Sequence, residues 1–176
     1  MSADVIIRRA RPADLRIVAP LIAAFRDSLQ LLEPDDREIE RGLGRLLRDG
    51  TVTLSLATAG AVAVGYALQR RHFSLWAQGD EALLEDLFVL EPARGRGVGR
   101  WLVEHVIGEA RAAGSRAMSL DTNEGNAASN ALYCSLGFSC ERQRWAGGRQ
   151  IRHDLKLEPG PQADGGIRWG PWMVKW

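Results

Sequence analysis

The chain has 176 residues, 45% of them hydrophobic, a formal net charge of +1 and two cysteines, which fits one soluble globular domain with a sizeable core. Its near-neutral charge argues against nucleic-acid binding, so any anion site must be built locally. Two cysteines without a CxxC pair argue against a disulfide framework and a zinc site. The N-terminal residues do not resemble a signal peptide, and no run of about 18 apolar residues predicts a membrane span. We therefore expect a cytoplasmic protein.

The N-terminal half is predicted to contain a strand, two helices and a hairpin. The stretch "VIIRRA" (5–10) is typical of a strand, and the apolar residues from Leu15 to Phe25 recur at helical spacing. A second helix is expected between Pro34-Asp35 and Gly50. Two β-rich runs, "TVTLSLAT" and "AVAVGYALQRR", follow and indicate an antiparallel hairpin.

The C-terminal half is predicted to add a βαβ unit, a short helix and a closing hairpin. The apolar run "ALLEDLFVL" is typical of a strand that is covered on both faces. A glycine-rich loop, a helix ending near Gly114, the strand "AMSLDT" (117–122) and a short helix ending at Gly137 come next. The order β-α-α-β-β-β-α-β-α-β-β predicts a mixed, mostly antiparallel α/β sheet rather than a doubly wound one.

The last residues differ in composition from the rest. We expect residues 1–158 to form the domain and residues 159–176 to form a tail rich in Gly, Pro and Trp. Because aromatic side chains gain by burial, Trp169, Trp172 and Trp176 predict that the tail packs on its own domain or on a partner subunit. A flexible tail is the alternative.

The loop "EPARGRGVGRWL" between the apolar strand and the following helix has three physical interpretations. A dinucleotide fingerprint fails because its third glycine would fall on Arg100, and a P-loop fails because the loop contains no lysine. The third is a strand-to-helix turn whose backbone N–H groups and flanking arginines hold a pyrophosphate. A surface loop with incidental glycines is the alternative. The residues concerned are Arg94, Gly95, Arg96, Gly97, Gly99 and Arg100.

Two motifs resemble those of the GNAT N-acetyltransferases. Residues 94–99, "RGRGVG", resemble the R/Q-x-x-G-x-G/A pyrophosphate loop of that family, and residues 126–138, "NAASNALYCSLGF", resemble its second signature. The resemblance covers roughly residues 5–157. It implies that acetyl-CoA lies in a V between two parallel strands, 83–90 and 117–122, that splay apart. The implied cofactor-binding residues are Leu87, Phe88, Val89, Arg94, Gly95, Arg96, Gly97, Val98, Gly99, Arg100, Asn126 and Ser129.

The resemblance also implies catalytic roles. Tyr133 matches the usual general acid, since a phenol held near the departing sulfur can protonate it without being ionised at neutral pH. The alternative is an aromatic anchor for its helix. The stretch "LEDLFV" resembles the spermidine/spermine and diamine N-acetyltransferases, which implies that Glu85 is a base or a substrate contact. The alternative is a carboxylate satisfied by a neighbouring arginine. Strand alternation allows only one of Glu85 and Asp86 to face the cleft, and Asp86 is expected to be structural or adjacent to the substrate.

The expected activity is therefore transfer of an acetyl group from acetyl-CoA to a primary amine of a small molecule, polyamine-like or aminoglycoside-like, in a ternary complex. Trp76, in the loop before the presumed catalytic strand, is a candidate for lining the acceptor site. No metal site is expected, and a homodimer follows from the habit of the family. The alternatives are a protein or peptide acetyltransferase and a non-catalytic acyl-CoA-binding module.

Overall fold

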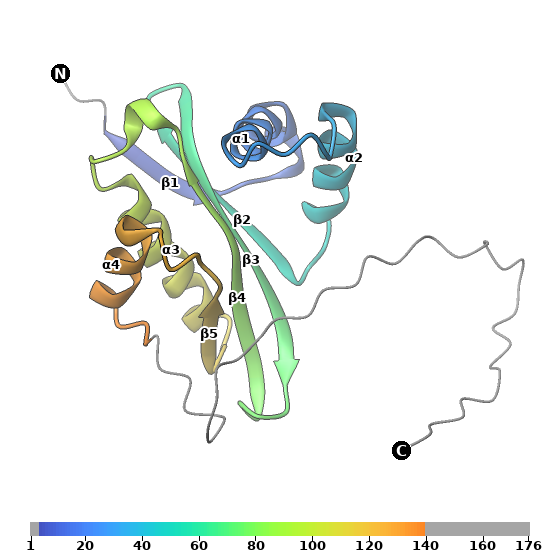
Figure 1. Ribbon diagram of the computed structural model, residues 1–176. Coiled ribbons are helices and arrows are strands. Elements are labelled where there is room, and N and C mark those ends of the chain that lie inside the picture. The colour runs from blue at the N-terminus through green and yellow to red at the C-terminus, as the bar shows by residue number, and fades with distance from the viewer. Residues whose placement is uncertain (1–3, 140–176) are drawn as a thin grey trace, which may run out of the picture. The chain divides into compact units, whose positions relative to one another are not determined.

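The computed structural model describes residues 4–139, which form a five-stranded sheet with helices on both faces (Figure 1). The closing hairpin and the tail expected from the sequence lie outside these residues. Two single-turn 3₁₀ segments, Pro12–Asp14 and Glu91–Ala93, precede α1 and α3. The elements are β1 (Val5–Arg9), α1 (Leu15–Ser28), α2 (Asp36–Leu46), β2 (Val52–Ala59), β3 (Val62–Ser74), β4 (Gly79–Val89), α3 (Val98–Ala112), β5 (Ala117–Leu120) and α4 (Ala127–Ser135).

The strand order is β1-β2-β3-β4-β5, with antiparallel neighbours up to β4 and a parallel pair formed by β4 and β5. This confirms the predicted mixed sheet. The predicted second helix is α2, which begins after Asp35 with a reciprocal cap: the Asp35 side chain accepts from the Glu38 amide, and the Glu38 side chain accepts from the Asp35 amide.

The sheet carries a separate apolar core on each face. Alternate strand residues such as Leu56, Tyr66 and Phe88 pack with α1 and α2, whereas Ala67 and Leu84 belong to the cluster that contains α3 and α4 side chains. Because successive strand residues point to opposite faces, both faces of β2, β3 and β4 are apolar over much of their length. This explains why β4 reads as a continuous apolar run.

The parallel ladder between β4 and β5 covers only part of β4. Their ladder joins Glu81–Leu84 to Ala117–Leu120, and β4 then continues to Val89 while paired with β3 on its other side. Strand β5 ends two residues before the predicted boundary at Thr122. The segment Glu85–Val89 therefore has no β5 partner, and we call this unpaired edge of β4 the strand opening; the resemblance places the acyl donor there.

A salt bridge between Arg8 and Asp14 connects β1 to the segment that begins α1. Arg8 Nη1 and Nη2 each donate to an oxygen of the Asp14 carboxylate at 2.7 Å, and the Arg11 amide donates to the same carboxylate. The Asp14 side chain is 11% exposed. The hydrogen bonds from Arg8 hold the pKa of Asp14 at about 2, below its usual value. This carboxylate therefore stabilises the fold at neutral pH.

We expect Asp14→Asn to lower the free energy of unfolding by about 1–2 kcal/mol at neutral pH, since Arg8 is partly exposed and solvent weakens the pair. A lowered pKa contributes stability above the unfolded-state value near 4 and loses it as the pH falls toward 2. Denaturant titrations of the variant and wild type should converge over that range, with the exposed Asp4→Asn as control. A difference that stays constant down to pH 2 would show that packing, not charge, is responsible.

Candidate active site

A β-bulge shapes β4 where it leaves β5. The β3–β4 register pairs Leu68 with Asp86 and then Gln69 with Leu84, so Glu85 is an extra residue in β4. A bulge breaks the regular alternation of side chains and re-aims them. Its effect is visible in the partners of the two carboxylates, which come from the same face of β3.

Glu85 and Asp86 both lie on the face covered by α1 and α2. Glu85 is bonded to Arg70 and Asp86 to Tyr66, and these two partners are four residues apart on β3, hence on one face. The strict alternation of side chains on which the expectation for these two residues rested is therefore absent here, because the bulge interrupts it. Which of the two carboxylates serves the acceptor stays a prediction.

The Glu85 carboxylate is held by an arginine. Arg70 donates from Nε to Glu85 Oε1 at 2.9 Å and from Nη2 to Oε2 at 3.5 Å. The third nitrogen of the same guanidinium group, Nη1, lies 3.6 Å from Asp49 Oδ2. The structure thus has the arrangement that the sequence left open as the alternative to a catalytic Glu85. Nothing in the sequence pattern identified Arg70, because the pairing depends on the β3–β4 register.

Asp86 is half-buried and has an unusual environment. It accepts a hydrogen bond of 3.3 Å from the hydroxyl of Tyr66, a residue that is fully buried. Burial raises the pKa of Asp86, the charge of Glu85 raises it further, and the bond from Tyr66 opposes both. Burial also raises the pKa of Tyr66, so this phenol stays protonated and can donate. A carboxylate with a raised pKa at a strand opening has the properties of a general base.

Tyr133 lies on the opposite face of the sheet from Asp86. It is 8% exposed, belongs to the α3-side core and meets Phe138 edge-on at 5.8 Å between ring centroids. Burial raises the pKa of Tyr133, so its hydroxyl keeps its proton at neutral pH. The aromatic-anchor role and the acid role are thus compatible in one residue.

The glycine loop joins β4 to α3 through left-handed backbone. Gly95 and Gly97 have φ values of +73° and +84°, which side chains with a Cβ rarely adopt. Gly97 is the N-cap of α3 and provides no side-chain cap, so the first-turn amides remain as donors at the positive end of the helix dipole. Residues 94–97 are exposed. These features fit a pyrophosphate.

Two of the three loop arginines are positioned by the protein. Arg94 donates from Nε to the Val89 carbonyl at 2.9 Å and lies over the Phe88 ring. Arg100 donates to Ser135 Oγ at 2.7 Å and so ties α3 to α4. Arg96 is exposed at the tip of the loop. The loop therefore offers exposed backbone amides, whereas two of its three guanidinium groups already bond protein oxygens.

The predicted cofactor residues on α4 form its N-terminal cap. The Asn126 side chain accepts a hydrogen bond of 3.2 Å from the Ser129 amide. Helix α4 in turn lies beside the first turn of α3: a Cβ built on Gly99 would lie 3.8 Å from Leu132 and 3.9 Å from Val89. The end of β4, the start of α3 and α4 thus lie close together.

Trp76 is placed elsewhere. It lies in the turn between β3 and β4 and is 86% exposed. This turn precedes β4, and at about 3.3 Å per residue it is roughly 20 Å along the strand from Glu85. The structure therefore does not bring Trp76 together with the two carboxylates, because β4 is longer than the sequence pattern suggested.

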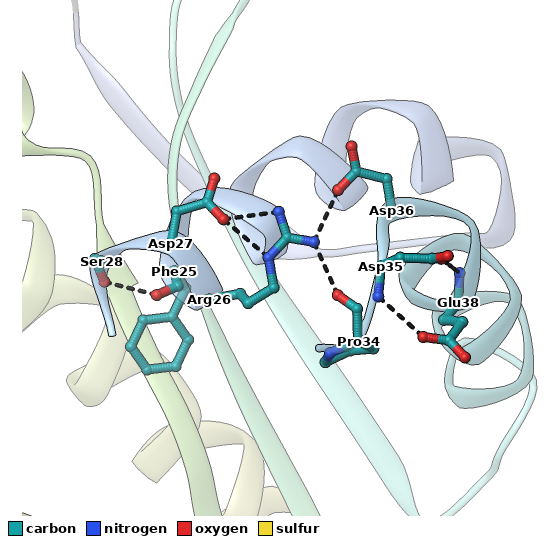
Figure 2. A network of polar contacts seen from close by, with 8 residues as sticks. All are labelled: Phe25, Arg26, Asp27, Ser28, Pro34, Asp35, Asp36 and Glu38. Carbon is teal, nitrogen blue, oxygen red and sulfur yellow. Dashed lines mark hydrogen bonds and ion pairs between the residues drawn. The ribbon is translucent and has the colours of Figure 1, made fainter. Parts of the chain in front are cut away.

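The α1–α2 connection adjoins the face that carries Asp86. Phe25, near the end of α1, lies 5.3 Å from the Phe88 ring and 6.4 Å from the Tyr66 ring. Figure 2 shows Arg26 at the centre of this connection, where it bonds Asp27, Asp36 and the carbonyl of Pro34 at 2.7–2.9 Å. This network fixes the connection beside the aromatic cluster.

Comparison with protein families identifies the fold. The family model described as "Acetyltransferase (GNAT) family" matches residues 20–138, which include the glycine loop, both carboxylates and Tyr133. The chain belongs to this family. The resemblance inferred from the two motifs is thereby confirmed for the GNAT family, while the spermidine-like subtype is not. Within residues 4–139 no helix of this GNAT protein has the length and apolar character needed to cross a membrane.

Individual relatives differ in what they acetylate. The chain is 30% identical to a D-amino-acid N-acetyltransferase of Saccharomyces cerevisiae over 51% of its length and 55% of the relative. It is 43% identical to a [ribosomal protein bS18]-alanine N-acetyltransferase of Salmonella typhimurium over 34% of its length and 40% of the relative. The chain thus spans about half the length of these curated relatives. A crystal structure of a probable acetyltransferase is similar at a TM-score of 0.73 and 26% identity, covering 85% of this chain and 99% of the other.

The left-handed N-cap provides a direct test of the cofactor cradle. A Cβ at Gly97 would require the φ of +84° and would lie 3.3 Å from the Trp101 ring. We expect Gly97→Ala to weaken coenzyme A binding about tenfold or more, because such strain costs about 1–2 kcal/mol and shifts the amides that face the anion. Isothermal titration calorimetry measures the effect.

The matched control is Gly108→Ala, which lies in the same helix with nothing within 4 Å of its added Cβ. This variant should bind coenzyme A as wild type does and gain stability from the better helix former. If the two variants bound coenzyme A with equal affinity, Gly97 would not be part of the coenzyme A binding site.

Proposed function

We propose that this GNAT protein transfers the acetyl group of acetyl-CoA to a primary amine of a small molecule by direct attack in a ternary complex. The observation that carries the proposal is that Asp86 lies just beyond the last β4–β5 pair, while Tyr133 lies in the core on the opposite face of the sheet. A base on one face and an acid on the other suit an amine that enters from one side and a thiol that leaves on the other.

Acetyl-CoA, when bound, supplies an activated acetyl group. The backbone of Leu87–Val89 borders the opening and would hold the pantetheine arm, and the amides of residues 95–100 would bind the pyrophosphate. Asp86 would accept a proton from the incoming amine on the α1 side. Tyr133 would donate its hydroxyl proton to the departing sulfur on the α3 side and later regain it from solvent. Asn126 and Ser129 would fix the start of α4 beside the cofactor.

In this proposal Asp86, rather than Glu85, is the base. The Glu85 carboxylate is bonded to Arg70, whereas Asp86 has a raised pKa and, within residues 4–139, one neutral hydrogen-bond donor, Tyr66. A base with a pKa closer to neutral takes up a proton more effectively than an ordinary carboxylate. Glu85 would act as a positioning residue, since its charge raises the pKa of Asp86.

A cationic small molecule is the proposed acceptor. Residues 26–38, which connect α1 to α2, contain five acidic residues against two arginines. Asp27 and Asp36 are 64% and 78% exposed and lie on the same side of the sheet as Asp86. Such an acidic border would attract a polyamine or an aminoglycoside. A relative named as a D-amino-acid N-acetyltransferase supports a small acceptor in this family.

A protein or peptide N-terminus is the second candidate. It is favoured by the relative named as a ribosomal-protein alanine acetyltransferase, which has the higher identity of the two over a shorter stretch. The experiment that separates the candidates follows thiol release from acetyl-CoA with spermidine, an aminoglycoside and an alanine-initiated peptide. Our proposal predicts turnover with at least one of the two cationic small molecules and little with the peptide. Turnover with the peptide alone would favour the second candidate.

A further inference from the structure

A partly enclosed cavity lies under the C-terminal half of α3, on the face opposite α1 and α2. It measures about 140 Å³ and is bordered by the end of α3, the residue that follows it and strands β1 to β4. A cavity of ~150 Å³ is known to admit a benzene-sized ligand, whereas one water takes up ~30 Å³. This cavity therefore has room for a small organic molecule.

The cavity is lined by buried polar atoms without partners. Gln69 is 6% exposed. Its Oε1 atom and the Oγ atom of Ser115 both line the cavity, and neither has a hydrogen-bond partner within residues 4–139. The other two buried polar side-chain atoms without a partner in this range are Ser55 Oγ, beside Thr53 on β2, and His105 Nε2, one turn before Glu109 on α3. Since native proteins satisfy nearly all buried polar groups, the two unpartnered atoms that line the cavity, Gln69 Oε1 and Ser115 Oγ, indicate a polar occupant.

Two arginines give the cavity its cationic character. Arg9 donates from Nη2 to the Val52 carbonyl at 3.3 Å, and Arg71 places Nε 3.2 Å from the Asp80 carboxylate. A guanidinium has five N–H donors, so both arginines retain donors for another anion beyond these contacts. Arginine binds carboxylates in a fork geometry, which favours a carboxylate as one end of the occupant.

The lining also includes hydrogen-bond acceptors, beside small and apolar residues. Gln69 Oε1 is an acceptor, and Glu109 places a carboxylate at the border of the same cavity. Acceptors require a donor on the occupant, and an ammonium or a hydroxyl provides one. We propose that this cavity binds a small carboxylate that also carries an N–H or O–H donor, of the size of glycine or glycolate.

The cavity is separate from the proposed acetyl-transfer site. The glycine loop is at the first residue of α3 and Glu109 is in its last turn, so the two lie roughly 15–20 Å apart along the helix. The inference concerns binding alone and does not depend on acetyl transfer. Failure of one therefore leaves the other intact.

Calorimetric titration of the full-length protein with glycine, glycolate, acetate and ethylamine tests the proposal. Glycine or glycolate should bind, and acetate and ethylamine should each bind about tenfold more weakly or not at all, because each lacks one of the two groups. If acetate bound with the same affinity as glycine and glycolate, the occupant would not need an N–H or O–H donor, and that part of the proposal would be wrong. Ethylamine binding best would overturn the carboxylate. No heat with glycine or glycolate, and only ordered water in a soaked crystal, would overturn the proposal.

Two variants of residues that line the cavity test whether the ligand binds there. Gln69→Leu and Arg71→Met should each raise the dissociation constant about tenfold to a hundredfold, while the exposed Arg41→Met on α2 should leave it unchanged. Gln69→Leu should not lower the melting temperature of the ligand-free protein, since it removes a buried polar atom without a partner. Equal binding by Gln69→Leu, Arg71→Met and wild type would place the ligand elsewhere.

Discussion

Replacing Asp86 with Asn lowers kcat/KM for acetyl transfer by about 10²–10⁴-fold, if Asp86 is the base that receives the proton of the amine. The amide has nearly the same shape and can still accept the hydrogen bond from Tyr66, so the fold should be retained. Steady-state thiol release measures the loss. Affinity for coenzyme A should be unchanged, because the anion of the cofactor is proposed to bind the glycine loop, which follows the end of β4 and does not include Asp86.

The pH dependence separates Asp86 from a merely structural carboxylate. Burial raises the pKa of Asp86, so kcat/KM of the wild type should rise with pH through a value above that of an ordinary aspartate and then level off. Asp86→Asn should abolish this rise.

Glu85→Gln is the matched control, since it also removes one negative charge from β4. It should reduce kcat/KM only severalfold and move the rise to lower pH, because the charge of Glu85 raises the pKa of Asp86. A loss in Glu85→Gln as large as that in Asp86→Asn would return the base role to Glu85.

Replacing Tyr133 with Phe should lower kcat about a hundredfold, with the Michaelis constant for acetyl-CoA nearly unchanged. The phenyl ring keeps the edge-on contact with Phe138 and the burial in the α3-side core, and only the hydroxyl is lost. A general acid acts on the leaving thiol, so its loss appears in turnover rather than in binding. Comparison of kcat and the Michaelis constant measures both.

Phe138→Leu is the control for the packing role of Tyr133. It removes the ring contact at 5.8 Å but leaves the hydroxyl. This variant should be less stable and yet retain kcat within severalfold of wild type. If Tyr133→Phe retains full kcat, Tyr133 is an aromatic anchor only and the proton must reach the sulfur from another donor.

Periodicity and turn chemistry predicted most of the described fold. The capped start of α2, the hairpin of β2 and β3 and the covered strand β4 were all predictable, because each leaves a local pattern in the sequence. The glycine loop was likewise predictable, since Gly95 and Gly97 have the left-handed backbone that glycine favours.

The candidate site was predicted less well, and the bulge at Glu85 explains why. A bulge depends on the register between β3 and β4, which no local pattern in "LEDLFV" specifies. The partners Tyr66 and Arg70 lie on a different strand, so their effect on Asp86 and Glu85 could not be derived from neighbouring residues. Trp76 was misplaced with respect to the carboxylates for a similar reason, namely the unforeseen length of the β3–β4 hairpin.

The most direct test of the central claim is a mass-spectrometric count of acetylated amine against thiol released from acetyl-CoA, with a panel of cationic small amines. The proposed mechanism predicts one acetylated nitrogen for each thiol, and loss of both signals together in Asp86→Asn. The contradicting result would be that coenzyme A binds, yet neither the small amines nor the alanine-initiated peptide gains an acetyl group. The protein would then bind the acyl donor without transferring its acetyl group.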